Sequence, residues 1–93
     1  MEVRSSKHLF MRLAVRGIPH GLPRVIFQRA RRRCYDTIEK VEIAILKTKL
    51  YGRRRDVMIA YRREPTSVLI VTIHPLKRGQ FENRVRSGRW RLL

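Results

Sequence analysis

The sequence predicts a single α+β domain over residues 1–93. In it, two N-terminal helices precede an antiparallel meander of three to four strands and a short C-terminal helix. Apolar residues recur at three- and four-residue spacing in the first third of the chain, as on one face of a helix. From Lys40 onward, runs of β-branched residues alternate with turn sequences. Hydrophobic residues make up 43% of the chain, so one core can form without disulfides.

Two helices are expected in the first third of the chain. The first spans 6–16, where Leu9 and Leu13 define an apolar face, and it ends at Gly17. The second spans about 22–33 and carries an apolar stripe among arginines. Three basic residues at four-residue spacing line one edge of the first helix: His8, Arg12 and Arg16.

Three strands and a last helix are expected in the remainder. Residues 40–50 alternate in charge and carry β-branched side chains, although a helix also fits their spacing. A hairpin loop over 51–55 leads to a strand over 56–63. The strand over 67–74 is apolar on both faces, which predicts a central position in the sheet. A short helix over 77–86 follows.

The charge of the chain indicates the class of its partner. The sequence holds 18 arginines and 5 lysines against 7 acids, which gives a formal net charge of +16. Arginine binds a phosphate through two parallel hydrogen bonds, and nucleic acid is the commonest polyanion of a cell. We therefore expect RNA or the ribosome as the partner. The apolar runs are too short to span a membrane and no signal peptide is recognised, so we expect a cytoplasmic protein without a membrane partner.

No metal or other cofactor is expected. The sequence has no glycine-rich phosphate loop, and its histidines, acids and single cysteine are scattered. One class of chemistry remains, because the 2′-hydroxyl group of RNA is itself a nucleophile. A protein that cleaves RNA in this way needs only a base, an acid and cations near the phosphate.

His74 is the first candidate for proton transfer, because it ends the apolar strand on the face of Val68, Ile70 and Thr72, where the sheet meets solvent. Arg62 ends the preceding strand and is expected to flank it. His8 and Arg12 on the first helix are further catalytic candidates. For His74 the alternative is a half-buried structural histidine, and for Arg62 it is an ordinary solvated surface residue.

Two arginine-rich segments are candidates for binding RNA phosphates. The first is the hairpin loop with Arg53, Arg54 and Arg55, and the second precedes the C-terminus: Arg84, Arg86, Arg89 and Trp90. An aromatic residue among cations suits stacking on bases. The alternatives are a solvated loop for the first segment and packing of Trp90 on the core for the second.

The spacing His8-x3-Arg12-x3-Arg16-Gly17-Ile18 resembles the first helix of a small domain family allied to the BrnT and RelE toxins. The acid step at Asp36 and the strand end Val71-Thr72-Ile73-His74-Pro75 extend this resemblance over roughly residues 8–76. The resemblance implies a fold of the RelE or microbial ribonuclease type. It also implies metal-independent RNA cleavage, often on the ribosome, and an acidic antitoxin protein as a partner.

Two function classes follow from these observations. The first is a RelE/BrnT-like endoribonuclease, the toxin of a toxin–antitoxin pair, and the second is a non-catalytic RNA- or ribosome-binding protein. A weaker third class is a DNA-binding regulator that uses the first two helices as a helix-turn-helix. The arrangement of His74, Arg62 and the basic edge of the first helix distinguishes the first two classes. If these residues meet in one cleft, the arrangement favours the enzyme, and if they are scattered it favours the binding protein.

Overall fold

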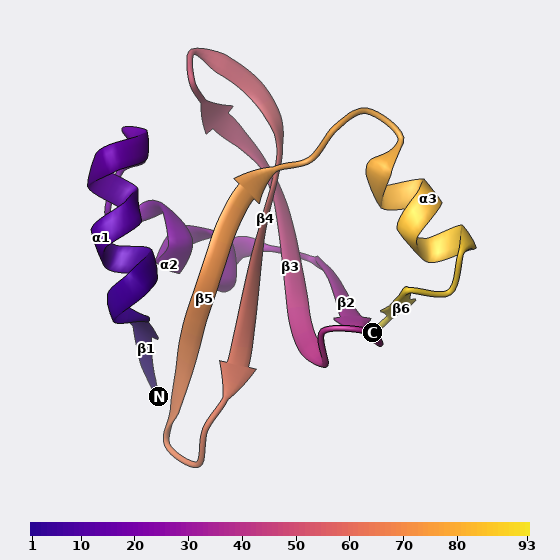
Figure 1. Cartoon of the computed structure of the whole chain (residues 1–93), viewed down its shortest axis with the longest axis horizontal. Coiled ribbons are helices and arrows are strands. Elements are labelled where there is room, and N and C mark those ends of the chain that lie inside the picture. Colours follow the sequence, from indigo (N-terminus) through magenta and orange to yellow (C-terminus); the bar gives the residue numbers. More distant parts are fainter.

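Six strands and three helices make up the computed structural model of the chain, which describes residues 1–93 (Figure 1). The strands form one mixed sheet in the order β1-β5-β4-β3-β2-β6. Strand β1 pairs with β5 in parallel, and every other neighbouring pair is antiparallel. The elements in chain order are β1 Glu2–Ser5, α1 Lys7–Arg16, α2 Leu22–Arg29, β2 Arg32–Asp36, β3 Val41–Leu50, β4 Arg53–Arg63, β5 Ser67–Pro75, α3 Gln80–Arg86 and β6 Trp90–Leu92.

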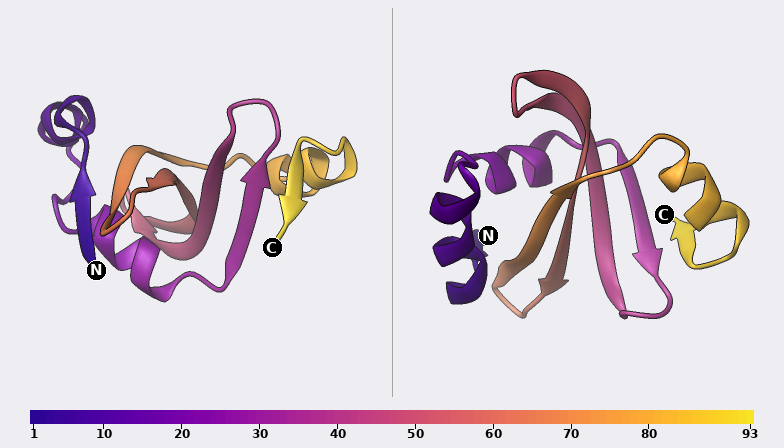
Figure 2. Two further views of the ribbon diagram at one scale, coloured as in Figure 1. Left: turned by 90° about the horizontal axis from the view of Figure 1, so that it is seen from below. Right: turned by 45° about the horizontal axis from the view of Figure 1, so that its top comes forward.

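The two faces of the sheet carry separate apolar clusters. Leu13 of α1 and Ile26 of α2 pack with Ile59 and Tyr61 of β4 in the larger cluster. Because side chains alternate along a strand, the neighbouring residues of β3 and β4 point to the opposite face. There Met58 joins a smaller cluster beside α3. Figures 1 and 2 place α1 and α3 at opposite ends of the twisted sheet.

The fold class predicted from the sequence is wrong. The sheet is mixed and has six strands instead of an antiparallel meander of three to four, and strands account for 45% of the chain against 27% for helices. The helices are also interspersed among the strands, because β1 precedes α1 and β6 follows α3. Both missed strands are short, and they form through pairing with segments that lie far away in the sequence.

The second predicted helix is too long. It ends at Arg29, and Ala30 adopts an extended conformation with φ −65° and ψ 133°. Residues Arg32–Asp36 then form β2, in which Cys34 is buried and pairs with Ile43 of β3. The basic residues at this junction fit a helix C-terminus equally well by sequence, so only the pairing with β3 decides between the two.

Several local predictions are confirmed. The first helix begins after Ser6, whose hydroxyl group accepts a hydrogen bond from the backbone of Leu9, and it ends at Gly17 with φ 68°. Residues 40–50 form a strand and not a helix. The loop predicted over 51–55 is shorter, since Arg53 already pairs with Leu50.

No helix of the chain combines the length and apolar composition needed to cross a membrane.

Candidate functional site

A cavity of about 410 Å³ opens on the sheet face opposite α1 and α2, and we call it the sheet cavity. Its floor is apolar and comes from β3 and β4, including Ile43, Met58 and Ala60. Its walls carry most of the polar groups. These polar lining residues are Asp36, Glu39, Arg62, Thr72, His74, Gln80, Arg84 and Arg89.

A β-bulge turns His74 into the sheet cavity. Tyr61 of β4 pairs with Ile70, but the next residue along, Ala60, pairs with Thr72. The extra residue in β5 reverses the alternation of side chains beyond it. Ile70 therefore packs on the α1/α2 face, whereas His74 lines the cavity on the other face. The prediction that His74 shares the face of Val68 and Ile70 is wrong for this reason, whereas Thr72 does lie on the face of His74 as predicted.

The surroundings of His74 favour its neutral form. Partial burial lowers the pKa of the imidazole below its ordinary value of 6.5, and the positive charge of Arg16 lowers this pKa further. The ring nevertheless remains exposed on the cavity side. An exposed neutral imidazole at pH 7 can accept a proton, so the geometry and the pKa both suit a general base.

Arg62 and His74 line the same cavity from its two ends. The strands β4 and β5 are antiparallel, and His74 pairs with Met58 while Arg62 pairs with Leu69. Their backbones are thus about 13 Å apart along the strands, at roughly 3.3 Å for each of four residue steps. The expectation that Arg62 flanks His74 is therefore wrong, because β4 and β5 run in opposite directions and their last residues lie at opposite ends of the paired strands.

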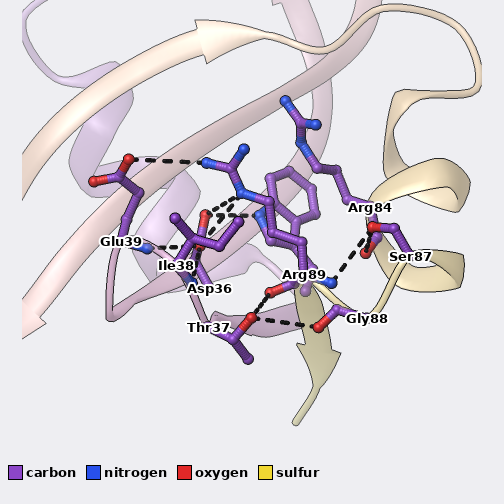
Figure 3. Close-up of polar contacts among 9 residues, drawn as sticks. Asp36, Thr37, Ile38, Glu39, Arg84, Ser87, Gly88 and Arg89 are labelled. Carbon is purple, nitrogen blue, oxygen red and sulfur yellow. Dashed lines mark hydrogen bonds and ion pairs between the residues drawn. The ribbon is translucent and has the colours of Figure 1, made fainter.

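Asp36 forms the centre of a hydrogen-bond network at one wall of the cavity (Figure 3). Its Oδ1 accepts from the backbone N–H groups of Ile38 and Glu39 at 3.0 and 2.9 Å, and its Oδ2 accepts from the indole of Trp90 at 3.0 Å. Arg89 Nε lies 3.3 Å from the same Oδ2. Every lone pair of this carboxylate has a partner, which is typical of a structural group.

The ionisation of Asp36 reflects this network. Burial of the carboxyl group raises its pKa, but the hydrogen bonds from Glu39, Trp90 and Ile38 and the charge of Arg89 lower it, and the net pKa lies below 3.8. The group is 3% exposed and stays ionised at pH 7. It therefore positions Arg89 and Trp90 at the cavity wall and has no free proton to give.

Three cationic or titratable groups of the cavity have no acidic partner. No hydrogen bond or ion pair joins the side chains of Arg62, Arg84 or His74 to another residue. Figure 3 shows Arg84 extending from α3 with its guanidinium group apart from the Asp36 network. Arg89 differs, since its charge is engaged by Asp36 and lies 4.0 Å from Glu39. The free groups are available to an anion.

Several residues predicted for the site lie elsewhere. His8 and Arg12 are exposed on α1, which packs on the other sheet face, so the basic edge of the first helix does not enter the sheet cavity. Arg86 and Arg54 are exposed and line neither this cavity nor the one described next. Trp90 is 3% exposed, and its ring packs in the smaller apolar cluster as in the core alternative.

Arg53 and Arg55 line a second cavity of about 290 Å³, between the β3–β4 hairpin and the start of α3, and we call it the hairpin cavity. Four polar residues of the sheet cavity were missed as site residues by the sequence reasoning: Asp36 as its structural centre, Glu39, Thr72 and Gln80. The alternation along β5 already placed Thr72 on the face of His74, because both residues lie beyond the bulge. No sequence signal indicates Gln80, because α3 reaches the cavity only through tertiary packing.

No group of three or more histidine, cysteine or acidic side chains converges to hold a metal ion. Searches against protein-family models, curated proteins and solved structures returned no match to this chain. The site is therefore interpreted from its own chemistry.

Proposed function

We propose that this protein binds single-stranded RNA, with the phosphodiester backbone held in the sheet cavity. The observation that carries the proposal is the convergence of Arg62, Arg84 and His74, none of them paired with an acid, around one cavity. Unpaired guanidinium groups bind phosphates through charge-assisted hydrogen bonds. The apolar floor at Met58 and Ile43 gives a base or ribose an apolar surface to lie on.

The distribution of charge over the molecule supports a polyanionic partner. Six of the seven acids lie in ion pairs, and these pairs engage only four of the 23 lysines and arginines: Arg4, Arg32, Arg63 and Arg89. The remaining cations repel one another across a small surface. Release of counterions from RNA phosphates favours binding by such a surface.

The cavity favours a single strand of RNA over a duplex. A volume of about 410 Å³ is in the range of small-ligand sites, so it accommodates a nucleotide unit and not a helix. A single strand can turn its unstacked bases into such a cavity. Thr72, Gln80 and Glu39 line it and can hydrogen-bond a 2′-hydroxyl group, which DNA lacks.

Fluorescence anisotropy with a labelled oligouridylate in EDTA tests this proposal. We expect binding at low ionic strength that weakens steeply as the salt concentration rises. The slope of the logarithm of the binding constant against the logarithm of the salt concentration should fall in magnitude by about 0.7 for each phosphate contact removed. The double variant Arg62→Ala, Arg84→Ala is expected to lower both affinity and slope. The double variant Arg29→Ala, Arg31→Ala removes two exposed arginines that line neither cavity, so it changes the net charge by the same amount and serves as the matched control. An equal loss of RNA affinity in both variants would show that the sheet cavity is not the binding site.

A second candidate function is RNA cleavage, and the position and lowered pKa of His74 favour it. In this reaction His74 accepts the proton of a 2′-hydroxyl group, and the 2′-oxygen attacks the adjacent phosphorus. The bond from phosphorus to the 5′-oxygen breaks, and water or the protonated His74 returns a proton to that oxygen. Arg84 stabilises the negative charge on the phosphorus oxygens. The products are a 2′,3′-cyclic phosphate and a 5′-hydroxyl group.

Incubation of RNA with the protein in EDTA, followed by analysis of the ends, tests this second function. A 2′,3′-cyclic phosphate end that disappears with a 2′-O-methyl substrate supports it, since the methyl group blocks the nucleophile. Intact RNA at stoichiometric protein leaves the protein as a binder only. The role as a toxin with an acidic antitoxin partner depends on this cleavage and stays a prediction.

A further inference from the structure

The hairpin cavity concentrates positive charge next to the sheet cavity. Five of its lining residues are cationic, namely Lys47, Arg53, Arg55, Lys77 and Arg78. Its two acids are Asp56 and Glu82. Such an excess of cations around one concave surface costs free energy unless an anion neutralises it.

Asp56 neutralises these cations only in part, because Arg32 engages both of its carboxylate oxygens and, among the five, its charge interacts with Lys47. Arg32 donates from Nη2 to Oδ1 at 2.7 Å and from Nη1 to Oδ2 at 3.2 Å, so both carboxylate oxygens are engaged. This pairing is the main reason that the pKa of Asp56 lies below its ordinary value. The Arg32 guanidinium also lies over the ring of Phe81, 5.3 Å from its centroid, and this ring lines the cavity.

Arg55 provides a separate indication that a hydrogen-bond acceptor is missing. Its Nε atom is buried and has no hydrogen-bond partner in the protein. A buried N–H donor of a charged group that lacks an acceptor is costly and rare. Because Arg55 also lines the hairpin cavity, a rotation of its side chain would bring this N–H group to a phosphate oxygen bound there.

The two cavities lie on either side of one short segment. His74 lines the sheet cavity and Leu76 lines the hairpin cavity, and two extended residues span at most about 7 Å. The segment is held by a hydrogen bond from Leu76 N–H to the Asp56 carbonyl and by one from Lys77 N–H to Gln80 Oε1. Gly79, with φ 78°, turns the chain so that Gln80 returns to the sheet cavity.

We propose that the hairpin cavity binds a second phosphate group of the RNA strand that occupies the sheet cavity, with Arg55 as its central ligand. This inference rests on the proposed function and defines the course of the strand across the segment 75–79. It also makes RNA longer than one nucleotide unit the preferred ligand. Lys77 and Arg78 contribute charge from the exposed rim.

The test measures the affinity of wild-type protein and Arg55→Ala for a 2′-O-methyl oligouridylate of about twelve nucleotides, which lies within the known range of single-strand site sizes. We expect about a tenfold loss of affinity and a salt slope lower by about 0.7. The variant Arg78→Ala, which alters only an exposed side chain, is expected to change affinity in the same direction without affecting folding. Unchanged affinity in both variants, or a loss equal to that in Arg29→Ala, overturns the inference.

A second arm separates this inference from the proposed function. The three proteins compared on the same RNA are the double variant Arg62→Ala, Arg84→Ala, the single variant Arg55→Ala, and the triple variant that combines them. If the sheet cavity binds no RNA, the double variant binds like wild type, whereas loss in Arg55→Ala alone still identifies the hairpin cavity. If one strand occupies both cavities, a single uridine nucleotide with one phosphate group, bound in the sheet cavity, should lose affinity in the double variant but not in Arg55→Ala. A full effect of Arg55→Ala on this single nucleotide contradicts the second subsite.

Discussion

The indole Nε1 of Trp90 donates a hydrogen bond to Oδ2 of Asp36 at 3.0 Å, and this contact joins the last strand of the sheet to β2. The two residues are also cross-strand partners in the β2–β6 ladder. The same carboxylate holds Arg89 at the wall of the sheet cavity. One buried acid thus supports the edge of the sheet and one side of the candidate site.

Replacement of Asp36 by alanine is expected to lower the free energy of unfolding by about 3 kcal/mol, since it leaves Arg89 and a buried indole N–H without their acceptor. Urea unfolding at pH 7 measures the change. Glu82→Ala removes an exposed acid without an ion pair and should change the free energy of unfolding by less than about 0.5 kcal/mol. Equal effects of the two substitutions would contradict the structural role of Asp36.

The stabilising effect of Asp36 should depend on pH in the acid range. The folded protein lowers the pKa of this carboxyl group below 3.8, so its contribution is fully present above that value. It is lost as the pH falls through the lower pKa of the folded state. We expect the difference in unfolding free energy between wild type and Asp36→Asn to be constant between about pH 5 and 7. This difference should shrink below about pH 3.8. A difference that persists unchanged at the lowest accessible pH would argue against an ionised Asp36.

Trp90→Phe is expected to reduce stability but not RNA binding. The substitution removes the hydrogen bond to Asp36, at a cost of about 1–2 kcal/mol, and keeps an aromatic ring in the core. Trp90 is the only tryptophan, so its fluorescence also reports on its surroundings, and RNA should leave the emission of the buried ring largely unchanged. Strong quenching by RNA together with lost affinity in Trp90→Phe would favour base stacking instead.

If the protein cleaves RNA by the proposed reaction, His74→Gln is expected to lower the cleavage rate by about 10²- to 10⁴-fold. The neutral imidazole would act as the base, and its pKa lies below 6.5, so the rate should be at its full value at pH 7. It should fall as the pH drops through the lowered pKa, because the protonated ring cannot accept a proton. His20→Gln replaces an exposed histidine that lies edge-on to the ring of Phe10, outside the sheet cavity, and is the control. Cleavage that survives His74→Gln unchanged removes this residue from the mechanism.

Local patterns in the sequence predicted the parts of the fold that depend on neighbouring residues. The serine cap and Gly17 predicted the two ends of α1. The β-branched runs after residue 40 predicted the ends of β3, β4 and β5 to within a few residues. The second helix was extended into β2 because arginines suit both a helix end and an exposed strand. Strand β1 went unrecognised because its four residues carry no strong alternation and depend on β5 for pairing.

The candidate site was predicted in part. His74, Arg62, Arg84, Arg89 and Trp90 were expected at the site and do line one cavity. The face of His74 was wrong, since a bulge depends on how two strands pair and leaves little trace in either strand alone. The basic edge of α1 was expected near them, but the apolar residues Leu9 and Leu13 bind that helix to the other face of the sheet.

Composition and short-range spacing by themselves determined that this chain is an arginine-rich domain with a polyanion as its expected partner, because charge and helical or strand periodicity are properties of the sequence. Only the tertiary structure decided which arginines pair with acids, which face His74 occupies and which groups line the two cavities. Those relationships join residues up to 60 positions apart, as in the contact of Arg4 with Glu64. They arise from strand pairing and packing, which short-range patterns do not encode.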